Sequence, residues 1–341
     1  MLQYTGGTTG VSKGAMLTHG NLLSNAEQTL ERFGPYCRES EETIICPLPL
    51  YYIYAFMVNM IIFACRGNLN VLIPTPRDIN AFVSAIKPFK FTGFSGINTL
   101  FVGLSQVPEF KTLDFSELHL TISGGTTLTS AAVQIWQEVT GCFITEGYGL
   151  SETSPVLCFN EPRKEVFGTV GLPLTKTEIQ LWSEDGREVL EGEAGEIVAR
   201  GPQVMAGYWN CPDETQKVIT KEGFFKTGDI GVRTPTGQIK IIDRLKDMVI
   251  VSGFNVYPTE VEDVLTQHPN ILEAAVIGEP DDKTGEKICA YITVSTKLSS
   301  ETVIEHCREF LSSYKIPKKV EVLKELPKST VGKILRRKLR K

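Results

Sequence analysis

Residues 118–149, LHLTISGGTTLTSAAVQIWQEVTGCFITEGYG, contain a strand, a helix and a second strand in immediate succession. Apolar and β-branched side chains mark 118–125 and 142–149 as strands, whereas 130–139 has apolar residues at the three-to-four-residue spacing of a helix. This order is typical of parallel strands, because the helix carries the chain back to the edge where the next strand starts. The stretch therefore predicts a mainly parallel sheet covered by helices.

The same alternation extends upstream of this stretch. It predicts strands at 43–50, 68–74 and 91–96, and helices at 79–86 and 98–107. Between the first two strands lies the apolar run YYIYAFMVNMIIFAC, at 51–65. This run is too short to span a membrane and contains Asn59, so we expect a buried helix there.

Downstream of the sheet the pattern changes twice. From Gly168 to Asp243, short alternating runs are separated by turn sequences such as EDGRE and PTGQ, which predicts hairpins in a small β subdomain. After Asp243, we expect one strand at MVIVSGFNV, followed by alternating helices and strands and by a basic terminal stretch that we expect to be helical. The boundary falls in the polar sequence DRLKD. We therefore predict an α/β fold with a large domain at 1–167, a β-rich subdomain at 168–243 and a small α+β domain at 244–341.

Composition excludes several classes of protein. With 42% hydrophobic and 22% charged residues, the chain of 341 residues is typical of globular proteins. Its net charge of −5 argues against a nucleic-acid partner. The eight cysteines are scattered without a CxxC pair, which excludes a disulfide framework or a Cys-rich zinc site and fits a reducing cytosol. Met1 and Leu2 lead into a Gly/Thr-rich segment without a signal peptide, so we expect a cytoplasmic location.

Residues 4–15, YTGGTTGVSKGA, combine glycines, hydroxyl side chains and one lysine. Glycine lets the backbone come close to a ligand, and hydroxyls with exposed backbone N–H groups suit phosphate oxygens. The segment is not a Walker loop, because Lys13 does not directly follow the preceding glycine and is itself followed by Gly14. A phosphate cradle is one interpretation, and a flexible Gly/Thr turn is the other.

Two further Gly-rich segments, SGGTTLT at 123–129 and EGYGLSET at 146–153, follow predicted strands of the parallel sheet. Ligands of such sheets bind at the carboxyl ends of the strands. Two glycines flank Tyr148, which would place an aromatic face where backbone can lie close to a flat ring. Glu152 is an oxygen ligand suited to Mg²⁺. The alternative is an ordinary exit from a strand, with a capping serine and a solvated glutamate.

Three residues in the second half are candidate contacts for a nucleotide. Asp229, in the sequence TGDIG, is suited to bind the hydroxyls of a ribose, and Arg244 would add a second hydrogen-bonding group. Lys333 follows Gly332 in the basic tail, where it would place one cation against charge that develops on a phosphoryl group. The structural alternatives are a turn residue, a surface salt bridge and a solvated basic tail.

Six segments occur in the order and approximate spacing of one enzyme superfamily: YTGGTTGVSKGA, SGGTTL, EGYGLSET, TGDIG, DRLKDMVIVSGFNVYPTEVE and PKSTVGKILRR. Together they resemble the adenylate-forming superfamily of acyl-CoA synthetases, luciferases and nonribosomal-peptide adenylation domains. Within it, the chain looks like a bacterial long-chain fatty acid–CoA ligase, on the sequences LPLYYIYAF, TPRD, GINTLF, GPQVMAGYW and VSGFNVYP. The resemblance covers essentially the whole chain.

The resemblance implies a nucleotide site built from several of these segments. The loop over the β- and γ-phosphates of ATP would consist of Thr5, Gly6, Gly7, Thr8, Thr9, Gly10 and Lys13. The adenine would lie along Gly124, Gly125 and Thr126, with Tyr148 and Gly149 at the base. Asp229 and Arg244 correspond to the pair that binds the ribose. The pocket for the fatty carboxylate would include Tyr52, Gly96 and Asn98.

The resemblance also implies the groups that act in catalysis. These are Thr5, Ser151, Glu152 and Lys333. Ser151 stands where the family usually has threonine, Glu152 matches the glutamate that binds Mg²⁺, and Lys333 matches the lysine required for adenylation. Lys246 falls at the hinge about which a mobile C-terminal domain rotates. Gly253 lies in the segment that meets the pantetheine of CoA.

ATP, Mg²⁺ and CoA are thus the implied cofactor and co-substrates, and a fatty acid is the implied substrate. The carboxylate would attack the α-phosphorus of ATP to give acyl-AMP and pyrophosphate, and the CoA thiol would attack acyl-AMP after the small domain has rotated. We expect small-molecule partners and no nucleic acid. Contact of the basic tail with the inner face of the membrane, and a homodimer, are left open.

Two departures from the family pattern stand out. Full-length members carry a large N-terminal portion before the phosphate loop, so the resemblance implies a truncated large domain, of which residues 1–167 are the C-terminal part. We expect the 341-residue chain alone to bind ATP weakly and to show little turnover. At position 52 a tyrosine replaces the histidine of the usual LPLYHIF pattern, which removes an ionisable imidazole.

Other functions are open at this point. A fatty acyl-AMP ligase would share the adenylation motifs and deliver the acyl group to a carrier protein, and other relatives would use aryl or short-chain acids. A nucleotide-binding remnant without catalysis would fit a truncated chain, although the retained Glu152, Asp229, Arg244 and Lys333 argue against it. A dehydrogenase is the weakest alternative, because no GxGxxG follows an early strand.

Overall fold

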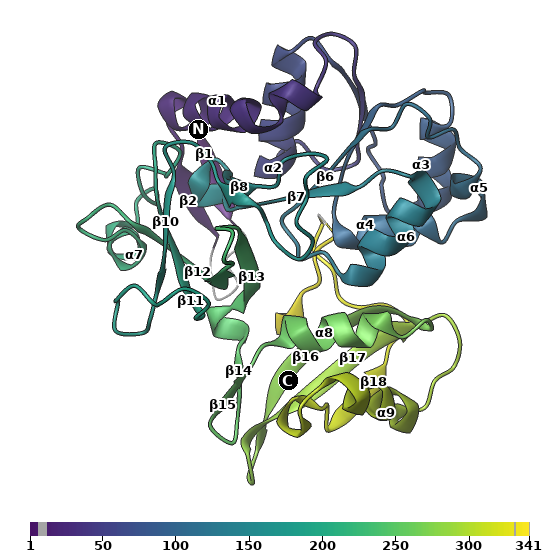
Figure 1. Ribbon diagram of the computed structural model, residues 1–341, viewed down its shortest axis with the longest axis vertical. Coiled ribbons are helices and arrows are strands. Elements are labelled where there is room, and N and C mark those ends of the chain that lie inside the picture. The colour runs from purple at the N-terminus through teal and green to yellow at the C-terminus, as the bar shows by residue number, and fades with distance from the viewer. Residues whose placement is uncertain (6–11, 331, 341) are drawn as a thin grey trace. The chain divides into compact units, whose positions relative to one another are not determined.

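The computed structural model describes residues 1–5, 12–330 and 332–340, which form an α/β protein (Figure 1). These residues divide into two compact units. The large unit comprises 1–128, 133–227 and 231–241, and the small unit comprises 129–132, 228–230 and 242–341.

The centre of the large unit is a sheet that has seven strands in the described chain, in the order β4-β3-β5-β6-β7-β8-β9. They are β3 (Thr43–Cys46), β4 (Leu69–Leu72), β5 (Gly93–Gly96), β6 (Leu120–Gly124), β7 (Ile144–Gly149), β8 (Val156–Phe159) and β9 (Leu172–Pro173). The first five in this order pair in parallel, and β8 and β9 pair antiparallel. The mainly parallel sheet predicted from the sequence is confirmed.

Helices cover this sheet. They are α1 (His19–Phe33), α2 (Ile53–Ala55), α3 (Ile79–Ile86), α4 (Asn98–Ser105), α5 (Pro108–Lys111) and α6 (Ser130–Thr140), with a 3₁₀ turn η1 (Gly34–Tyr36). In the view of Figure 1, α3 to α6 lie to one side of β6 and β7, and α1 with α2 to the other. The buried ring of Trp136 on α6 lies 5.0 Å from Phe94 on β5 and 4.8 Å from Phe101 on α4. This aromatic cluster joins two helices to the sheet.

The apolar run 51–65 is helical but not regular. After α2, residues Phe56–Phe63 form a π-helix, η2, within the run where a buried helix was expected. Within it, Asn59 is completely buried. Its Nδ2 donates to Oδ1 of Asn70 on β4 (3.1 Å), and Asn70 Nδ2 donates back to the Asn59 carbonyl oxygen (3.1 Å). A buried amide in an apolar helix needs hydrogen-bond partners. This pairing supplies one for Asn59 Nδ2, whereas Asn59 Oδ1 has no partner among the described residues.

Two antiparallel sheets accompany the parallel one. β1 (Leu2–Thr5) and β2 (Lys13–Met16) form a hairpin in which Thr5 lies opposite Lys13. The other sheet contains β10 (Glu178–Trp182), β11 (Gly195–Arg200), β12 (Phe225–Arg233) and β13 (Ile239–Arg244), and α7 (Pro212–Val218) connects β11 to β12. This second sheet agrees with the β subdomain predicted for the fold, whereas the three domain boundaries stay predictions.

The small unit is built on a sheet with five strands among the residues that are described, in the order β15-β14-β17-β16, with β18 parallel to β17. Its elements are β14 (Val249–Val251), β15 (Phe254–Val256), α8 (Pro258–Gln267), β16 (Ile271–Asp281), β17 (Gly285–Val294), α9 (Ser300–Phe310) and β18 (Lys319–Val322). Both helices lie along this sheet in Figure 1. Val261 and Leu265 of α8 and Val303 and Cys307 of α9 are buried in the same apolar core as the strands.

The sequence MVIVSGFNV, expected as one strand, is a hairpin of β14 and β15. Ser252 has a φ of 52° and Gly253 a φ of 83°. Two consecutive left-handed residues close a two-residue hairpin turn, so the chain reverses at the Ser-Gly pair and cannot continue as a strand.

The basic terminal helix expected from the sequence is absent from the described residues of the tail. After 327 the chain forms an isolated bridge between Lys328 and Ile334, and a 3₁₀ turn, η6, at Arg336–Lys338. Gly332 has a φ of 81°, which ends any helix at that residue. Leu339 is buried beside Leu326 in a second apolar cluster of the small unit. Tertiary contacts thus override the helical tendency of the Lys- and Arg-rich sequence.

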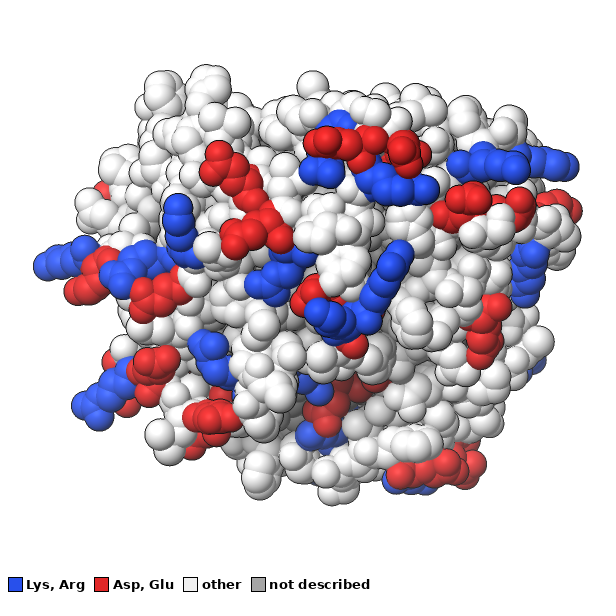
Figure 2. Space-filling model, turned by 45° about the horizontal axis from the view of Figure 1, so that its top comes forward, with Lys and Arg blue, Asp and Glu red and all other residues white. Residues whose placement is uncertain are grey.

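No helix in the described ranges is long and apolar enough to cross a bilayer. All eight cysteines carry free thiols, as their scattered positions predicted. On the face drawn in Figure 2, Lys and Arg side chains are interspersed with Asp and Glu and do not gather into a patch of one sign.

Candidate functional site

The carboxyl ends of β5, β6 and β7 bring three of the predicted segments together. Gly96 pairs with Ser123, and Gly124 pairs with Gly147, so the ends of these three strands lie side by side. Just beyond them, the Asn98 backbone N–H donates to Oγ1 of Thr126 (3.4 Å). Because parallel strands end at one edge, residues that are far apart in the sequence meet here, where such sheets bind ligands.

Glycines at this edge are required by packing within the protein. A Cβ atom on Gly149 would lie 1.8 Å from the carbonyl oxygen of Pro155, and one on Gly147 would lie 2.5 Å from the ring of Phe159. Gly149 could therefore not be replaced without a shift of the backbone. The sequence interpretation, in which these glycines make room for a flat ring beside Tyr148, is not needed to explain them. Tyr148 itself is partly buried against the apolar cluster under β8.

Glu152 has a buried carboxylate, with 8% of the residue exposed. It lies in the 3₁₀ turn η3 (Ser151–Thr153) that follows β7. The hydroxyl of Tyr208, also buried, donates to Glu152 Oε1 (2.8 Å). Burial and the negative charge of Glu152 raise the pKa of Tyr208, so the phenol stays protonated and acts as a donor. The hydrogen bond fixes the orientation of the Glu152 carboxylate.

Lys13 connects the β1–β2 hairpin to the same group. Its Nζ lies 4.6 Å from the centre of the Tyr208 ring and 2.8 Å from Oε2 of Glu214 on α7. Hydrogen bonds from Lys13 and Lys217 hold the pKa of Glu214 at about 2. The hairpin therefore places the lysine of the predicted phosphate loop next to the tyrosine that holds Glu152.

Thr5 ends β1, opposite Lys13. The predicted loop residues between these strands, Gly6, Gly7, Thr8, Thr9 and Gly10, lie outside the described residues.

Of the predicted pocket residues Tyr52, Gly96 and Asn98, the last two lie at the same edge. Tyr52 is partly buried, packs between two apolar clusters of the large unit, and its ring lies 6.2 Å from that of Tyr54. A Cβ on Gly96 would lie 2.6 Å from the ring of Phe101, so this glycine too is required by packing.

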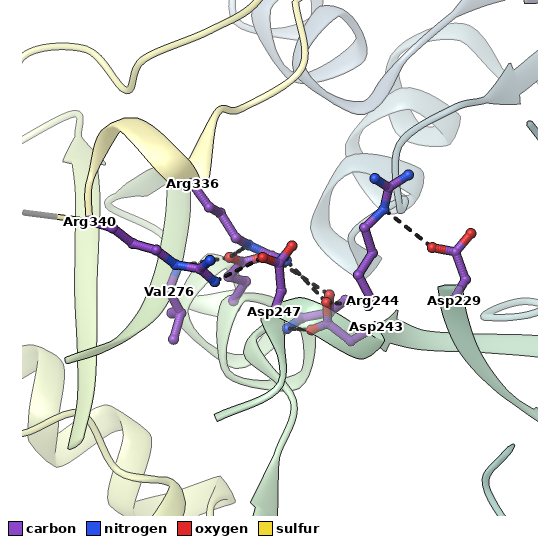
Figure 3. Close-up of polar contacts among 9 residues, drawn as sticks. Asp229, Asp243, Arg244, Asp247, Val276, Arg336 and Arg340 are labelled. Carbon is purple, nitrogen blue, oxygen red and sulfur yellow. Dashed lines mark hydrogen bonds and ion pairs between the residues drawn. The ribbon is translucent and has the colours of Figure 1, made fainter. Parts of the chain in front are cut away.

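In the small unit, the predicted ribose pair is an ion pair. Arg244 Nε lies 3.2 Å from Oδ1 of Asp229, whose side chain is 7% exposed while that of Arg244 is 46% exposed (Figure 3). Gly228, immediately before Asp229, has a φ of 72°, which favours glycine. One partner is thus held inside the protein and the other reaches the solvent.

The predicted hinge residue Lys246 lies in the 3₁₀ turn η4 (Leu245–Asp247), directly after Arg244. Burial, with the positive charge of Arg244, lowers the pKa of Lys246 to about 8. The predicted CoA contact Gly253 is at the turn between β14 and β15, and no atom lies within 4 Å of the Cβ position that a side chain would occupy.

Lys333 is bonded to the segment that precedes it in the tail. The Ser329 backbone N–H donates to the Lys333 carbonyl oxygen (2.8 Å), and the Lys333 N–H donates to Oγ of Ser329 (3.2 Å). The Leu335 N–H donates to the carbonyl oxygen of Pro327 (2.7 Å). These bonds join residues 327–329 to residues 333–335, while residue 331 lies outside the described residues.

The sequence analysis missed Tyr208 and Arg336 as site candidates. Tyr208 was noted only as part of GPQVMAGYW, and Arg336 only as part of a basic tail. No local pattern marks either residue, because their acidic partners Glu152 and Glu262 lie 56 and 74 positions away.

The buried carboxylate of Glu152, in the turn after β7, is a candidate metal ligand. Within the described ranges, no group of three or more His, Cys, Asp and Glu side chains is arranged to hold a metal ion. Oε1 of Glu152 accepts the Tyr208 hydrogen bond, which leaves Oε2 for another ligand. Such a site suits Mg²⁺, which keeps several waters and binds through one or two carboxylates together with substrate phosphates.

Comparisons with known proteins match both halves of the chain. A family model described as AMP-binding enzyme matches residues 1–209, and one described as AMP-binding enzyme C-terminal domain matches residues 260–333. A long-chain-fatty-acid–CoA ligase of Salmonella typhimurium is 46% identical over 341 residues, which cover 99% of this chain and 61% of that protein. The chain therefore spans less than two thirds of this relative's length.

Two solved structures have the same fold at similar coverage. The anthranilate CoA ligase AuaEII in complex with anthranoyl-AMP superposes with a TM-score of 0.92 and 30% identity, over 99% of this chain and 66% of that one. ATP-bound MatB from Rhodopseudomonas palustris superposes with a TM-score of 0.90 and 31% identity, over 99% of this chain and 67% of that one.

Proposed function

The chain belongs to the AMP-binding enzyme family, and from this premise we propose that it is the part of a long-chain fatty acid–CoA ligase that holds the nucleotide and the catalytic lysine. The reaction would activate a fatty acid with ATP to acyl-AMP and pyrophosphate, and then transfer the acyl group to CoA. Family membership confirms the resemblance inferred from the six sequence motifs. The observation that carries the substrate assignment is the 46% identity to a long-chain-fatty-acid–CoA ligase.

The first half-reaction would use the residues predicted to contact the nucleotide. The fatty carboxylate attacks the α-phosphorus in line, and pyrophosphate leaves. Tyr148 and residues 124–126 bind the adenine, and Asp229 with Arg244 binds the ribose. Lys13 and Lys333 place positive charge on the phosphoryl oxygens, where negative charge builds up in the transition state. Bound Mg²⁺ would neutralise phosphate charge, and Glu152 is the residue that would hold it.

The second half-reaction is thioester formation. The CoA thiol attacks the acyl carbonyl of acyl-AMP, and AMP leaves with its phosphate already charged. We propose that residues 244–341 rotate about Lys246 between the two steps, which withdraws Lys333 and brings the turn at Gly253 to the pantetheine. Tyr52, with Asn98 at the edge of the parallel sheet, would line the site of the fatty carboxylate.

The test of this function is a substrate-dependent release of AMP. We expect AMP and thioester to form with oleate, ATP and CoA, and we expect anthranilate, the acid of the solved complex, to be a poor substrate. Because the chain spans 61% of its relative, the assay uses the chain joined to the N-terminal portion that the resemblance implies, with the 341-residue chain measured beside it. Acyl-AMP formation without transfer to CoA would favour a ligase that loads a carrier protein.

ATP binding without any acyl-AMP, in the extended protein, would favour a nucleotide-binding remnant. This outcome would contradict the ligase assignment but not family membership. Contact with the inner membrane face and a homodimer stay predictions, which vesicle sedimentation and analytical ultracentrifugation would test.

Replacement of Tyr208 by phenylalanine is expected to weaken Mg²⁺ use. The change removes one hydroxyl, so Glu152 Oε1 loses its hydrogen-bond donor while the buried ring keeps its place. The Mg²⁺ concentration that gives half-maximal acyl-AMP formation should rise roughly tenfold, the lower end of the effect of outer-shell partners on metal affinity.

The control for this variant is Tyr36→Phe, which removes a hydrogen bond from a tyrosine hydroxyl to the carboxylate of Glu161 in the same unit. A direct measurement of Mn²⁺ binding in the presence of ATP separates metal affinity from turnover. Unchanged metal dependence in Tyr208→Phe would mean that the hydrogen bond only supports the fold.

A further inference from the structure

Arg336, in the turn η6, uses its whole guanidinium group on partners of the small unit (Figure 3). Its Nε and Nη2 donate to the two oxygens of Glu262 (2.9 and 2.6 Å). Its Nη1 donates to Oδ1 of Asp243 (3.0 Å) and Oδ2 of Asp247 (3.4 Å), and Nη2 also donates to Oγ1 of Thr259 (3.3 Å). A guanidinium has five N–H donors in a fixed plane, and here five contacts use them. The orientation of Arg336 is therefore fully determined.

The acidic partners of Arg336 are held in turn by other segments. Asp243 Oδ2 accepts from the Thr259 backbone N–H (2.7 Å), and Glu262 Oε1 accepts from the Val276 N–H (2.7 Å). Asp247 Oδ1 accepts from Arg340 Nη2 (2.9 Å). The network thus joins the predicted hinge segment 243–247, helix α8, strand β16 and the tail.

The network is shielded from solvent. The side chain of Arg336 is 16% exposed, and those of Asp243, Asp247 and Glu262 are 2%, 13% and 15% exposed. Removal of one partner would leave charges buried without compensation, which is far more costly than the loss of a surface salt bridge.

Lys333 lies three positions before Arg336. The preceding segment, to which Lys333 is bonded through Ser329, is also anchored, because Lys328 Nζ pairs with Oε1 of Glu273 on β16 (2.8 Å). Because only two residues separate Lys333 from Arg336, and the Leu335 N–H is bonded to Pro327, the position of the Lys333 backbone follows the position of Arg336.

We propose that Arg336 is a positioning residue for Lys333: it ties the segment that carries the lysine to Asp243 and Asp247, on either side of Lys246, and so fixes the lysine relative to the hinge. This inference rests on the proposed function. In the adenylation step the coupling would hold Lys333 where it meets the phosphoryl group, and in the thioester step, where Lys333 has no part, the coupling would be without effect.

The test is Arg336→Lys, measured in both half-reactions in the extended protein. A lysine keeps the charge but cannot supply five donors in one plane. We expect the kcat of acyl-adenylate formation, followed by pyrophosphate release, to fall about tenfold while the KM for ATP stays within about twofold. Thioester formation from supplied oleoyl-AMP should be unchanged. The control Lys338→Gln alters an exposed cation of the same turn and should change neither half-reaction.

A general loss of stability would give another pattern. It would lower the rates of both half-reactions together with the melting temperature. An equal loss of rate in the two half-reactions would overturn the inference. A double variant separates the two residues. If Arg336 acts only by positioning Lys333, Arg336→Lys should not lower the residual rate of adenylation in Lys333→Ala any further. If the two residues act independently, the two reductions in rate should multiply.

A milder variant covers the case in which Arg336→Lys does not fold. Asp247→Asn removes one charge partner of Arg336 and leaves the contacts to Glu262 and Asp243 in place. We expect the kcat of acyl-adenylate formation to fall about threefold and thioester formation to be unchanged. If Lys333→Ala blocks adenylation and Asp247→Asn has no effect on it, the inference fails while the proposed function stands. If Lys333→Ala itself has no effect, the proposed role of the lysine fails first.

Discussion

Replacement of Lys333 by alanine is expected to lower the rate of acyl-adenylate formation by two orders of magnitude or more. In the proposed reaction, negative charge moves onto the phosphoryl oxygens as pyrophosphate leaves, and a fixed cation stabilises this charge more than the charge of the ground state. Backbone hydrogen bonds from Ser329 to Lys333 and from Leu335 to Pro327 hold the backbone on both sides of this side chain. Alanine removes the ammonium group without a change to these backbone bonds.

The same variant should form the thioester from supplied oleoyl-AMP at close to the unaltered rate. The CoA thiol attacks a carbonyl that is already activated, and in the proposed rotation Lys333 has left the site by then. Stopped-flow measurement of AMP release from oleoyl-AMP and CoA checks this point, with Lys338→Ala as the control. Loss of both half-reactions to the same degree would contradict the rotation, and loss of neither would remove Lys333 from the mechanism.

Replacement of Asp229 by alanine is expected to raise the KM for ATP about 10- to 100-fold. A hydrogen bond to a charged group contributes about 1.5–3 kcal/mol, and the Asp229 carboxylate is buried, so water replaces the lost contact poorly. The kcat should change much less, because a ribose contact is the same in the ground state and in the transition state.

Two further variants separate binding from folding at this position. Asp229→Asn keeps the shape and one acceptor oxygen but loses the charge that pairs with Arg244 at 3.2 Å, so an intermediate KM is expected. Asp282→Ala, at an exposed aspartate of the small unit, is the matched control. If ATP dependence is unaltered in Asp229→Ala, the residue serves only the local structure of β12.

The sequence predicted best those features that depend on near neighbours in the chain. Residues 118–149 contain the apolar periods of two strands and one helix, and the structure has β6, α6 and β7 there. Periodicity is local, since it reflects which side of each element is buried. The turn at Ser252-Gly253 is local as well and carries a hairpin signal, which the interpretation as one strand overlooked.

Features that depend on distant partners were not predictable in this way. The terminal helix was wrong because Gly332 turns the chain and Leu339 and Arg336 find partners in the core and on α8. The buried helix predicted within 51–65 is present, but its π-helical form at 56–63 and the pairing of Asn59 with Asn70 on a neighbouring strand were not predicted. In the tail, tertiary contacts outweigh a propensity that amounts to tenths of a kcal/mol per residue.

The sequence by itself determined the family, the order of the six motifs and the mainly parallel sheet, because residue identity and spacing are sufficient for each of these. Only the tertiary structure decided which atoms meet. Tyr208 donates to Glu152, Arg336 joins the tail to the hinge segment, and Gly149 leaves room for Pro155. These contacts join residues whose separation along the chain says nothing of their distance in space. The polar contacts form because a buried donor or charge is unstable without a hydrogen-bond partner, and the glycine is required because the interior is close-packed.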